Sequence, residues 1–586
     1  MNLEEALTGE ITEALKKLYG FEGVPSDITL QHTRKDFEGD RTLVVFPFLK
    51  LSGKSPEETG NEVGSYLQKH SSLIGSHNVV KGFLNLLIED DFWLDWLSSY
   101  KGEKVEKRKG TYMVEYSSPN TNKPLHLGHI RNNLLGYSVS RILEARGKDV
   151  VKVQVINDRG IHICKSMLAW QKFGKGQEPG KDVKGDHLVG DYYVRFDQEY
   201  KKEVAGLVGS GMDEKEAEKA APIMKEAQEM LIRWEKGDEA VVSLWKRMNS
   251  WVYKGFEETY HRLGVDFDKL YYESDTYLVG KEEVLKGVES GFFYRKEDGS
   301  VWVDLEDVGL DKKVLIRSDG TSVYMTQDIG TAILRFRDYP GLRQLIYTVG
   351  NEQNYHFKVL FAILKKLGYE WADECVHLSY GMVELPSGKM KSREGTVVDA
   401  DDLMDEMEDT ARRKSEELGK LEGLSEGERK ELYHTIGMGA LKYFILKVDP
   451  KKQMTFNPDE SIDFAGNTGP FIQYTHARIR TLLGKSSERS SAGSEVKPEG
   501  VERSIIRELY RYREVLEQSA NEFNPAHLAN YLYELVKMYN HFYQTIPVLK
   551  EEDGKKREFR LLLSEKVADR IAEGMELLGI QVPDRM

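Results

Sequence analysis

The chain has 586 residues, of which 40% are hydrophobic and 31% are charged, and its formal net charge is -14. This length exceeds what one hydrophobic core usually organises, so we expect three or four domains, and no apolar run is long enough to predict a membrane span. The acidic balance does not exclude a nucleic-acid partner, because charges are screened beyond roughly 8 Å at physiological salt and local basic patches decide.

The number of cysteines and the first residues of the chain indicate the cellular compartment of the protein. Cys164 and Cys375 are the only cysteines and lack C-x-x-C spacing, which excludes a disulfide framework and argues against a cysteine-built zinc site. The opening MNLEEALTGEITEALKKLYG predicts an acidic amphipathic helix and has no features of a signal peptide. We therefore expect a cytoplasmic protein with reduced thiols.

Residues 1–100 predict a small α+β domain. The opening helix is followed by the strand-like stretches TLVVFPFLK (42–50) and GFLNLLI (82–88). The next stretch, KGEKVEKRKG (101–110), has one apolar residue and many charges, so it predicts a linker.

Strands and helices alternate from residue 111. TYMVEYS (111–117), a helix over 131–147 and DVVKVQVIND (149–158) predict a βαβ unit and hence a parallel sheet. Residues 185–265 are helical and highly charged, and they are too long for a simple crossover. We predict that they form a helical insertion in a domain that spans 110–400.

Three strand-like stretches follow the insertion, GSVWVDL, KKVLIRS and SVYMT, and then helices over 328–339 and 357–368 alternate with strands over 343–350 and 377–385. From about 400 the periodicity is helical, apart from a Ser/Gly-rich loop over 486–500. The sequence thus predicts a connecting segment over 401–460 and an all-α domain over 461–586.

The stretch SSPNTNKPLHLGHIRNN (117–133) places His126, Gly128 and His129 where a strand gives way to a helix. A helix that begins beyond the carboxyl end of a parallel strand directs unpaired N–H groups at anions. Two imidazoles separated by a glycine can hydrogen-bond phosphate oxygens while the backbone lies against a nucleotide. The alternative is that both histidines only cap the helix.

A second stretch, GKMKSREGT (388–396), carries Lys389, Lys391 and Arg393 between glycines. Alone it is typical of a solvated basic turn. Together, H-x-G-H early and K-M-x-S late in a split α/β sheet resemble the two signatures of class I aminoacyl-tRNA synthetases. That resemblance implies a Rossmann-type catalytic domain, ATP, an amino acid and tRNA.

Longer stretches resemble the arginyl-tRNA synthetase family over nearly the whole chain. They are EYSSPNTNKPLHLGHIRNN, VINDRGIHI, VYMTQDIG, VGNEQNYHF, GNTGPFIQYTHAR and LLGIQVPDRM. The resemblance implies an arginine–tRNA ligase that uses ATP with Mg²⁺. L-arginine attacks the α-phosphorus to give arginyl-adenylate, and the 2′-hydroxyl of the terminal adenosine of tRNA(Arg) takes the arginyl group. No protein side chain is expected to bind a metal.

Arginine carries a planar guanidinium with five donors, so its pocket needs carboxylates and other acceptors. The resemblance implies that Glu115, Tyr324 and Asp328 contact its side chain, while Asn120 and Gln353 hold its amino and carboxylate end. Each position has a simpler interpretation: Glu115 as a solvent residue of an edge strand, Tyr324 as core, and Gln353 as a turn residue.

The resemblance also implies the residues that contact ATP, with the histidines at the α-phosphate, Gly128 under the adenine and the lysine loop at the β- and γ-phosphates. The loop departs from the family's K-M-S-K-S, because Ser392 stands where the second lysine belongs. Related arginine enzymes with a changed loop carry a lysine before the histidine motif, as Lys123 does here. The predicted ATP-site residues are Lys123, His126, Gly128, His129, Lys389, Lys391, Ser392 and Arg393.

The outer domains are expected to bind tRNA, in part by stacking aromatic side chains on bases. By resemblance, Phe83 and Asn85 contact the D-loop, and Tyr539, Asn540, Tyr543 and Met586 contact the anticodon loop. For the aromatic residues the alternative is a core position. We expect a monomer without a membrane partner.

Three other functions share parts of this pattern. The first is a class I synthetase for glutamine, glutamate, cysteine or lysine; missing zinc ligands disfavour cysteine, and the two carboxylates proposed for a cationic side chain disfavour glutamate. A silent tRNA-binding paralogue would have lost the histidines or the lysine loop. A small nucleotidyltransferase would leave the two outer domains without a role.

Overall fold

The computed structural model describes residues 3–34, 36–100, 102, 105–107, 109–386, 398–419, 423–486 and 496–586. The predicted ATP-site residues Lys389, Lys391, Ser392 and Arg393 lie outside the described residues. The chain forms two compact units, which are described separately below. Unit 1 comprises 1–103, 482–511 and 537–567, and unit 2 comprises 104–481, 512–536 and 568–586. The four predicted domain ranges remain a prediction.

Unit 1 contains a four-stranded antiparallel sheet in the order β1-β2-β4-β3. The predicted first helix forms as α1 (Leu3–Tyr19), whose buried Leu3, Leu7, Ile11 and Leu15 recur at helical spacing. The predicted strand over 42–50 ends early, at Val44, because Pro47 has no N–H to donate to a neighbouring strand. The chain then forms η2 (Phe46–Phe48) and α2 (Leu49–Ser52). The other elements are η1 (Pro25–Asp27), β1 (Leu30–His32), β2 (Arg41–Val44), α3 (Pro56–His70), β3 (Ile74–Val80), β4 (Phe83–Ile88) and α4 (Asp90–Ser99).

Segments from the C-terminal third complete unit 1. They belong to α18 (Gly500–Asn521), α19 (Ala526–Thr545) and α20 (Gly554–Leu577). Asp40, beside strand β2, has a side chain only 1% exposed and forms ion pairs with Arg503 and Arg507 of α18. Because unpaired buried carboxylates are costly, these two arginines fasten α18 to the sheet.

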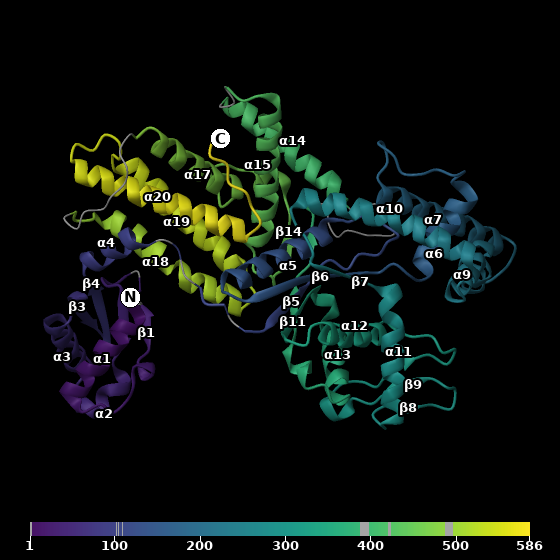
Figure 1. The fold of residues 1–586 in the computed structure, drawn as a ribbon, viewed down its shortest axis with the longest axis horizontal. Coiled ribbons are helices and arrows are strands. Elements are labelled where there is room, and N and C mark those ends of the chain that lie inside the picture. Colours follow the sequence, from purple (N-terminus) through teal and green to yellow (C-terminus); the bar gives the residue numbers. More distant parts are fainter. Residues whose placement is uncertain are drawn as a thin grey trace. The chain divides into compact units, whose positions relative to one another are not determined.

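Unit 2 is built on a five-stranded sheet in the order β12-β11-β5-β6-β7, and every neighbouring pair is parallel. The strand order reverses between β5 and β11, which makes the carboxyl ends of these two strands the place where ligands collect in such sheets. The predicted parallel-sheet domain is confirmed (Figure 1). Its strands are β5 (Thr111–Glu115), β6 (Asp149–Ile156), β7 (Lys269–Tyr272), β11 (Leu342–Gly350) and β12 (Cys375–Tyr380).

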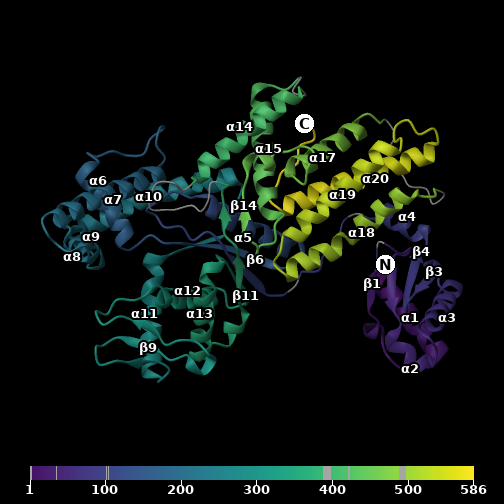
Figure 2. The ribbon, with the colours of Figure 1, turned by 180° about the vertical axis from the view of Figure 1, so that it is seen from behind.

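Helices cover both faces of this sheet. Helix α5 (Leu127–Ala145) lies on one face, and α12 (Tyr324–Asp338) and α13 (Asn354–Lys366) lie on the other (Figures 1 and 2). The core on the second face joins Met113 and Leu345 of the sheet to Ile329 of α12 and Leu360 of α13. Helix α11 (Glu273–Glu289) packs beside α12, and η4 (Asn351–Gln353) and η5 (Glu370–Glu374) flank α13.

The predicted helical insertion is present between β6 and β7. Strand β7 pairs with β6, so the insertion occupies the crossover between two neighbouring parallel strands. Its Asp158-containing entry loop is followed by α6 (Ile161–Phe173), α7 (Gly185–Gly209), α8 (Glu214–Ala220), α9 (Pro222–Glu235) and α10 (Glu239–Leu263).

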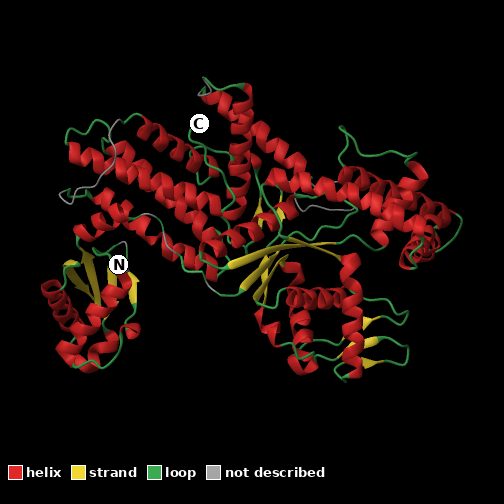
Figure 3. Ribbon diagram, in the orientation of Figure 1, coloured by secondary structure: helices red, strands yellow, loops and turns green. Residues whose placement is uncertain are grey.

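Two of the predicted strands after the insertion lie outside the parallel sheet. They form β9 (Val301–Val303) and β10 (Lys313–Ile316), which make a separate antiparallel sheet with β8 (Tyr294–Arg295), near η3 (Glu306–Val308) (Figure 3). The predicted strand SVYMT is wrong, because α12 begins at Tyr324. The buried Met325, Ile329 and Ala332 continue a helical spacing, which outweighs the short alternation.

The chain beyond residue 400 is helical, with one exception. The exception is β14 (Met454–Thr455), which helical periodicity did not predict and which pairs with β13 (Val383–Glu384), a part of the strand predicted over 377–385. The buried guanidinium of Arg131 on α5 fastens this region by donating to the carbonyls of Met382, Pro450 and Lys452. The helices here are α14 (Ala400–Leu418), α15 (Glu426–Leu446), α16 (Pro458–Ser461) and α17 (Gly469–Gly484).

Residues 577–583 belong to unit 2 and pack against its other segments through their carbonyl groups. Ser138 of α5 donates to Leu577, Lys442 of α15 donates to Gly579, and Gln473 of α17 donates to Gln581. Throughout the described part of the chain, no helix is long and apolar enough to cross a membrane.

Candidate active site

His126 and His129 cap the start of α5 reciprocally. His126 is the N-cap residue, and its Nδ1 accepts the N–H of Gly128 at 3.1 Å. The Nδ1 of His129 accepts the N–H of His126, also at 3.1 Å. The ring centroids lie 4.0 Å apart. The predicted alternative of helix capping is therefore correct for the Nδ1 atoms, and it leaves both Nε2 atoms for other partners.

Both imidazoles are neutral at physiological pH. Burial, helped by the charge of Lys123, lowers the pKa of His126 to about 4. Burial lowers the pKa of His129 further below its ordinary range, and His126 and Lys123 act in the same direction. Because each Nδ1 accepts a hydrogen bond, the single ring proton lies on Nε2. The start of α5 thus presents two fixed N–H donors.

Gly128 lies in the first turn, under the ring of His126. A Cβ atom at this position would lie 2.9 Å from Cε1 of His126, which is too close. Any larger residue would displace the capping imidazole. Glycine here therefore preserves the histidine geometry and leaves the backbone accessible.

The loop before α5 is held in a strained conformation. Ser117 has a φ of 61°, which is unusual for a residue with a side chain. Its N–H donates to Asn132 Oδ1 at 2.5 Å, and its hydroxyl bonds the hydroxyl of Tyr260. Asn132 in turn donates to the carbonyl of Thr348 on β11. These bonds fix the loop between the two central strands.

Glu115, the last residue of β5, is 7% exposed. It lies in a central strand, so the interpretation as an edge-strand solvent residue is wrong. One carboxylate oxygen forms an ion pair of 2.5 Å with Arg335 of α12, and the other accepts the hydroxyl of Ser118 at 3.2 Å. Arg335 is fully buried between the rings of Tyr271 and Tyr347. Glu115 therefore already has an internal guanidinium partner.

Of the two predicted carboxylates, Glu115 and Asp328, only Asp328 is accessible. Its side chain is 45% exposed, and its Oδ2 contacts Nε2 of His356 at 2.5 Å. One turn earlier on α12, Tyr324 is 71% exposed, so its interpretation as a core residue is also wrong. The side chains of Asp328 and Tyr324 are thus available to a ligand.

Tyr347 of β11 is the register partner of Glu115. Burial raises its pKa; Glu115 and Asp328 act in the same direction, and Arg335 opposes them. Glu273, at the start of α11, adds a third carboxylate near Asp328. Burial, with Asp158 and Asp328, raises the pKa of Glu273 to about 7. Sequence analysis did not identify Glu273, Arg335 or His356, although His356 lies in one of the family-like stretches.

The residues predicted for the amino and carboxylate end of arginine follow the same strands. Asn120 is exposed and forms an isolated parallel bridge with Asn157, just beyond the ends of β5 and β6. Gln353 is exposed at the end of η4, directly after β11. Both therefore lie at the carboxyl edge of the sheet.

Phe83 and Asn85 line a cavity of about 160 Å³ in unit 1. Phe83 is half-buried, and the guanidinium of Arg34 lies 5.7 Å from its ring centre. Asn85 is 1% exposed, and its amide bonds Thr42 and Asn78. The cavity thus offers an aromatic ring and a cation, while the Asn85 amide is engaged within the fold.

The four residues predicted at the anticodon loop differ in exposure. Tyr539 is fully buried and donates to Ser564 at 3.0 Å, so its prediction as a tRNA contact is corrected to a core residue. Asn540 is 8% exposed, Tyr543 is 37% exposed, and Met586 is partly exposed. Tyr543 therefore presents the larger surface of the two tyrosines.

Comparison with protein-family models gives two matches that together cover most of the chain. Residues 96–457 match the model described as tRNA synthetases class I (R), catalytic domain. Residues 472–586 match the DALR anticodon binding domain. The first match contains the whole parallel sheet, the histidine-capped helix and the insertion.

Full-length relatives and a solved structure agree with these models. The chain is 56% identical to an arginine–tRNA ligase of Bacteroides fragilis and to one of Bacteroides thetaiotaomicron, with 100% of each chain covered. The arginyl-tRNA synthetase of Thermus thermophilus superposes with a TM-score of 0.82 at 27% identity, again over 100% of both chains.

Proposed function

This chain belongs to the class I arginyl-tRNA synthetases, and from that premise we propose how its residues bind the substrates. It is an arginine–tRNA ligase, which joins L-arginine to tRNA at the expense of ATP. The proposal concerns three sites: ATP at the start of α5, L-arginine between β5, β11 and α12, and tRNA on both units.

The reciprocal capping of His126 and His129 carries the proposal for ATP. Both Nε2–H groups donate to oxygens of the α-phosphate, whose charge grows as arginine attacks. Neutral donors that are already oriented need no reorganisation during the reaction, which is the main source of such stabilisation. Lys123, whose pKa burial lowers, adds a cation beside the histidines. We assign the β- and γ-phosphates to Lys123 and Lys389.

For L-arginine, we assign different roles to Asp328 and Glu115, because the side chain of the first is exposed and that of the second is buried. Asp328 and Tyr324 accept the substrate guanidinium directly, because both side chains are open. Glu115 closes the inner end of the pocket, where Arg335 holds its carboxylate in place. Asn120 and Gln353 hold the amino and carboxylate end. The carboxylate then lies on the same sheet edge as the α-phosphate, so alignment supplies much of the rate.

Mg²⁺ would enter with ATP. Asp399, whose backbone pairs with that of His126, and Asp401 form ion pairs with His187 and Lys184. Mg²⁺ in nucleotide sites is commonly held by phosphates and water with few protein ligands, and these surroundings fit that pattern. When bound, it would neutralise phosphate charge.

For tRNA, Phe83 with Arg34 offers a stacking site to an unpaired base, and Tyr543 offers another on α19. Asn85, Asn540 and Met586 are proposed as neighbouring contacts. We also propose that the enzyme acts as a monomer in the cytoplasm.

The assignment is tested by ATP–pyrophosphate exchange with each amino acid, with and without tRNA. We expect exchange with arginine alone among the amino acids. Asp328→Asn should raise KM for arginine by at least tenfold and leave KM for ATP within about twofold, because one charge-assisted bond is lost. His126→Asn should raise KM for ATP instead. Equal effects of both variants on both substrates would contradict the two-site assignment.

A further inference from the structure

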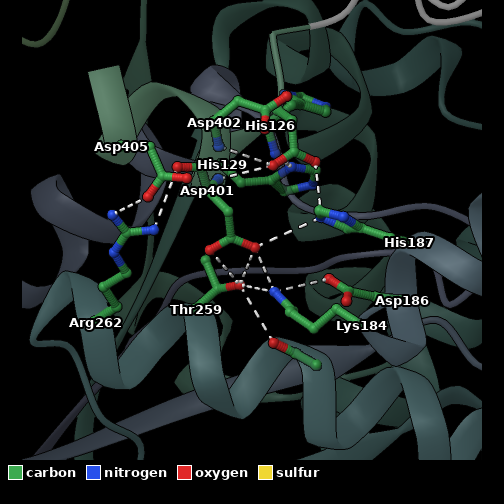
Figure 4. Close-up of polar contacts among 12 residues, drawn as sticks. His126, His129, Lys184, Asp186, His187, Thr259, Arg262, Asp401, Asp402 and Asp405 are labelled. Atoms are coloured by element: carbon green, nitrogen blue, oxygen red, sulfur yellow. Dashed lines mark hydrogen bonds and ion pairs between the residues drawn. The ribbon is translucent and has the colours of Figure 1, made fainter. Parts of the chain in front are cut away.

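A cluster of charged side chains lies directly beside the histidines (Figure 4). It joins the start of α7, the last turns of α10 and the start of α14. Lys184 donates to Thr259 at 2.6 Å and forms ion pairs with Asp401 and, at 3.4 Å, with Asp186. Thr259 also donates to Asp401 at 3.2 Å. Three segments that are distant in sequence are therefore joined by one network.

His187 is the member of this cluster nearest to the α14 N-cap. Its Nε2 lies 3.1 Å from Asp399 and 3.5 Å from Asp401. The carboxylates of Asp399 and then Asp401, which accept from His187, raise the pKa of His187 to about 10, so it carries a positive charge at neutral pH. In contrast to His126 and His129, it is a cation.

Asp399 connects the cluster to the proposed ATP site. His126 and Asp399 form an antiparallel bridge, in which Leu127 donates to Val398 and Ala400 donates to Leu125. The Asp399 carboxylate caps α14 by accepting the N–H of Asp401 at 2.8 Å. It lies near enough to act on the pKa of His126. A carboxylate is thus built in beside the place proposed for a phosphate.

A metal ion is the competing explanation. Ligand atoms of Asp186, His187 and Asp401 lie within 4.8 Å of one another. However, the Lys184 ammonium contacts the carboxylates of both aspartates, and His187 contacts Asp401. The negative charge that would attract a metal ion to this position is therefore already balanced by cationic side chains of the protein.

We propose that His187 is a positioning residue for ATP: it neutralises Asp399, so that the segment paired with His126 does not repel the phosphates. The proposal rests on the placement of ATP at His126 and His129 given above. A carboxylate without a partner at this distance would oppose a triphosphate, since such repulsion is weakly screened near a partly buried surface.

The proposal predicts that a second substitution reverses the effect of the first on KM for ATP. His187→Gln removes the positive charge and should raise KM for ATP about tenfold, with kcat and KM for arginine within about twofold. Asp399→Asn retains a capping side chain for α14. Added to His187→Gln, it should restore KM for ATP to within about twofold of the parent value. Steady-state aminoacylation kinetics measure all three constants.

A role that is only structural gives the opposite result. The double variant would then bind ATP as weakly as His187→Gln or more weakly, and this outcome overturns the proposal. An unchanged KM for ATP in His187→Gln overturns it as well. Thermal unfolding of each variant shows whether the fold is intact. The single variant Asp399→Asn is included to show the effect of the second substitution by itself.

The matched control is a second pair of a histidine and a carboxylate on α14. His434 of α15 pairs at 2.9 Å with Glu408 of α14, nine positions beyond Asp399. His434→Gln should leave KM for ATP within about twofold. If His126→Asn leaves KM for ATP unchanged, the placement of ATP fails. If His126→Asn weakens ATP and His187→Gln has no effect, only the present inference fails.

Discussion

Each histidine at the start of α5 uses its two ring nitrogens for different purposes. Nδ1 satisfies a backbone N–H of the first turn, and Nε2 carries the proton that a phosphate oxygen can accept. Two interpretations of the sequence, helix cap and phosphate ligand, are therefore compatible. The capping hydrogen bond to Nδ1 fixes the tautomer that has its proton on Nε2, and this Nε2–H group is the donor for a phosphate oxygen.

This arrangement predicts a pH dependence of stability. The pKa of His126 is about 4 in the folded chain, below its ordinary value of 6.5, so between these values the unfolded chain binds a proton that the folded chain does not. The contribution is complete above pH 6.5 and is lost as pH falls toward 4. In His126→Asn, whose side chain can still cap the helix, the fall in the free energy of unfolding between pH 6.5 and pH 4 should be smaller by on the order of 2 kcal/mol, as measured by urea unfolding. Parallel pH profiles for the two chains would contradict it.

Sequence reasoning proposed single site residues but not the partners that hold them in the fold. Glu115 was predicted to bind arginine, but nothing in the sequence indicated that Arg335, 220 positions later, would occupy its carboxylate. Tyr539 and Tyr543 lie four positions apart on one helix, so spacing alone could not show that one is core and the other partly exposed. Such differences are set by tertiary packing.

At the scale of elements, two glycines determine how closely α11 approaches α12. A Cβ on Gly280 would lie 1.8 Å from the carbonyl of Thr326, and one on Gly330 would lie 2.4 Å from the N atom of Gly280. The two backbones are therefore in direct contact. Because α12 carries Tyr324 and Asp328, this contact also sets the position of the proposed arginine pocket.

Gly280→Ala should therefore separate the helices. We expect a loss of about 2 to 3 kcal/mol of stability, typical of overpacking, and a severalfold higher KM for arginine with KM for ATP little changed. Chemical denaturation and aminoacylation kinetics measure the two effects. Gly206→Ala in α7, where nothing lies within 4 Å of the added Cβ, is the control and should be neutral or slightly stabilising. Equal stability of both variants would refute the contact.

The elements that were predicted correctly have long, regular patterns. Strands β5, β6, β11 and β12 and helices α5 and α13 were all found from periodicity. The errors involve short segments: β14 has two residues, and SVYMT alternates over too few positions to outweigh its helical continuation. The pairing of β8, β9 and β10 into a separate sheet depends on contacts that no local pattern encodes.

At the scale of the whole molecule, tRNA recognition is proposed on both units. On α19, the tyrosines provide a matched pair for testing it. Tyr543→Ala should raise KM for tRNA about tenfold or more through lost stacking, with little change in stability. Tyr539→Phe removes a buried hydrogen bond to Ser564 and should cost about 1 kcal/mol of stability without affecting KM for tRNA. The reverse pattern would show that the exposure of Tyr543 does not report tRNA contact.

The return of residues 577–583 to unit 2 has a consequence for synthesis on the ribosome. The bond from Ser138 to Leu577 spans 439 positions, so α5 is translated long before its last partner emerges. Domains generally fold as they leave the exit tunnel. In this chain, the surfaces of α5, α15 and α17 that residues 577–583 contact stay uncovered until translation is almost finished. A stalled or prematurely terminated chain would expose these surfaces to chaperones and proteases.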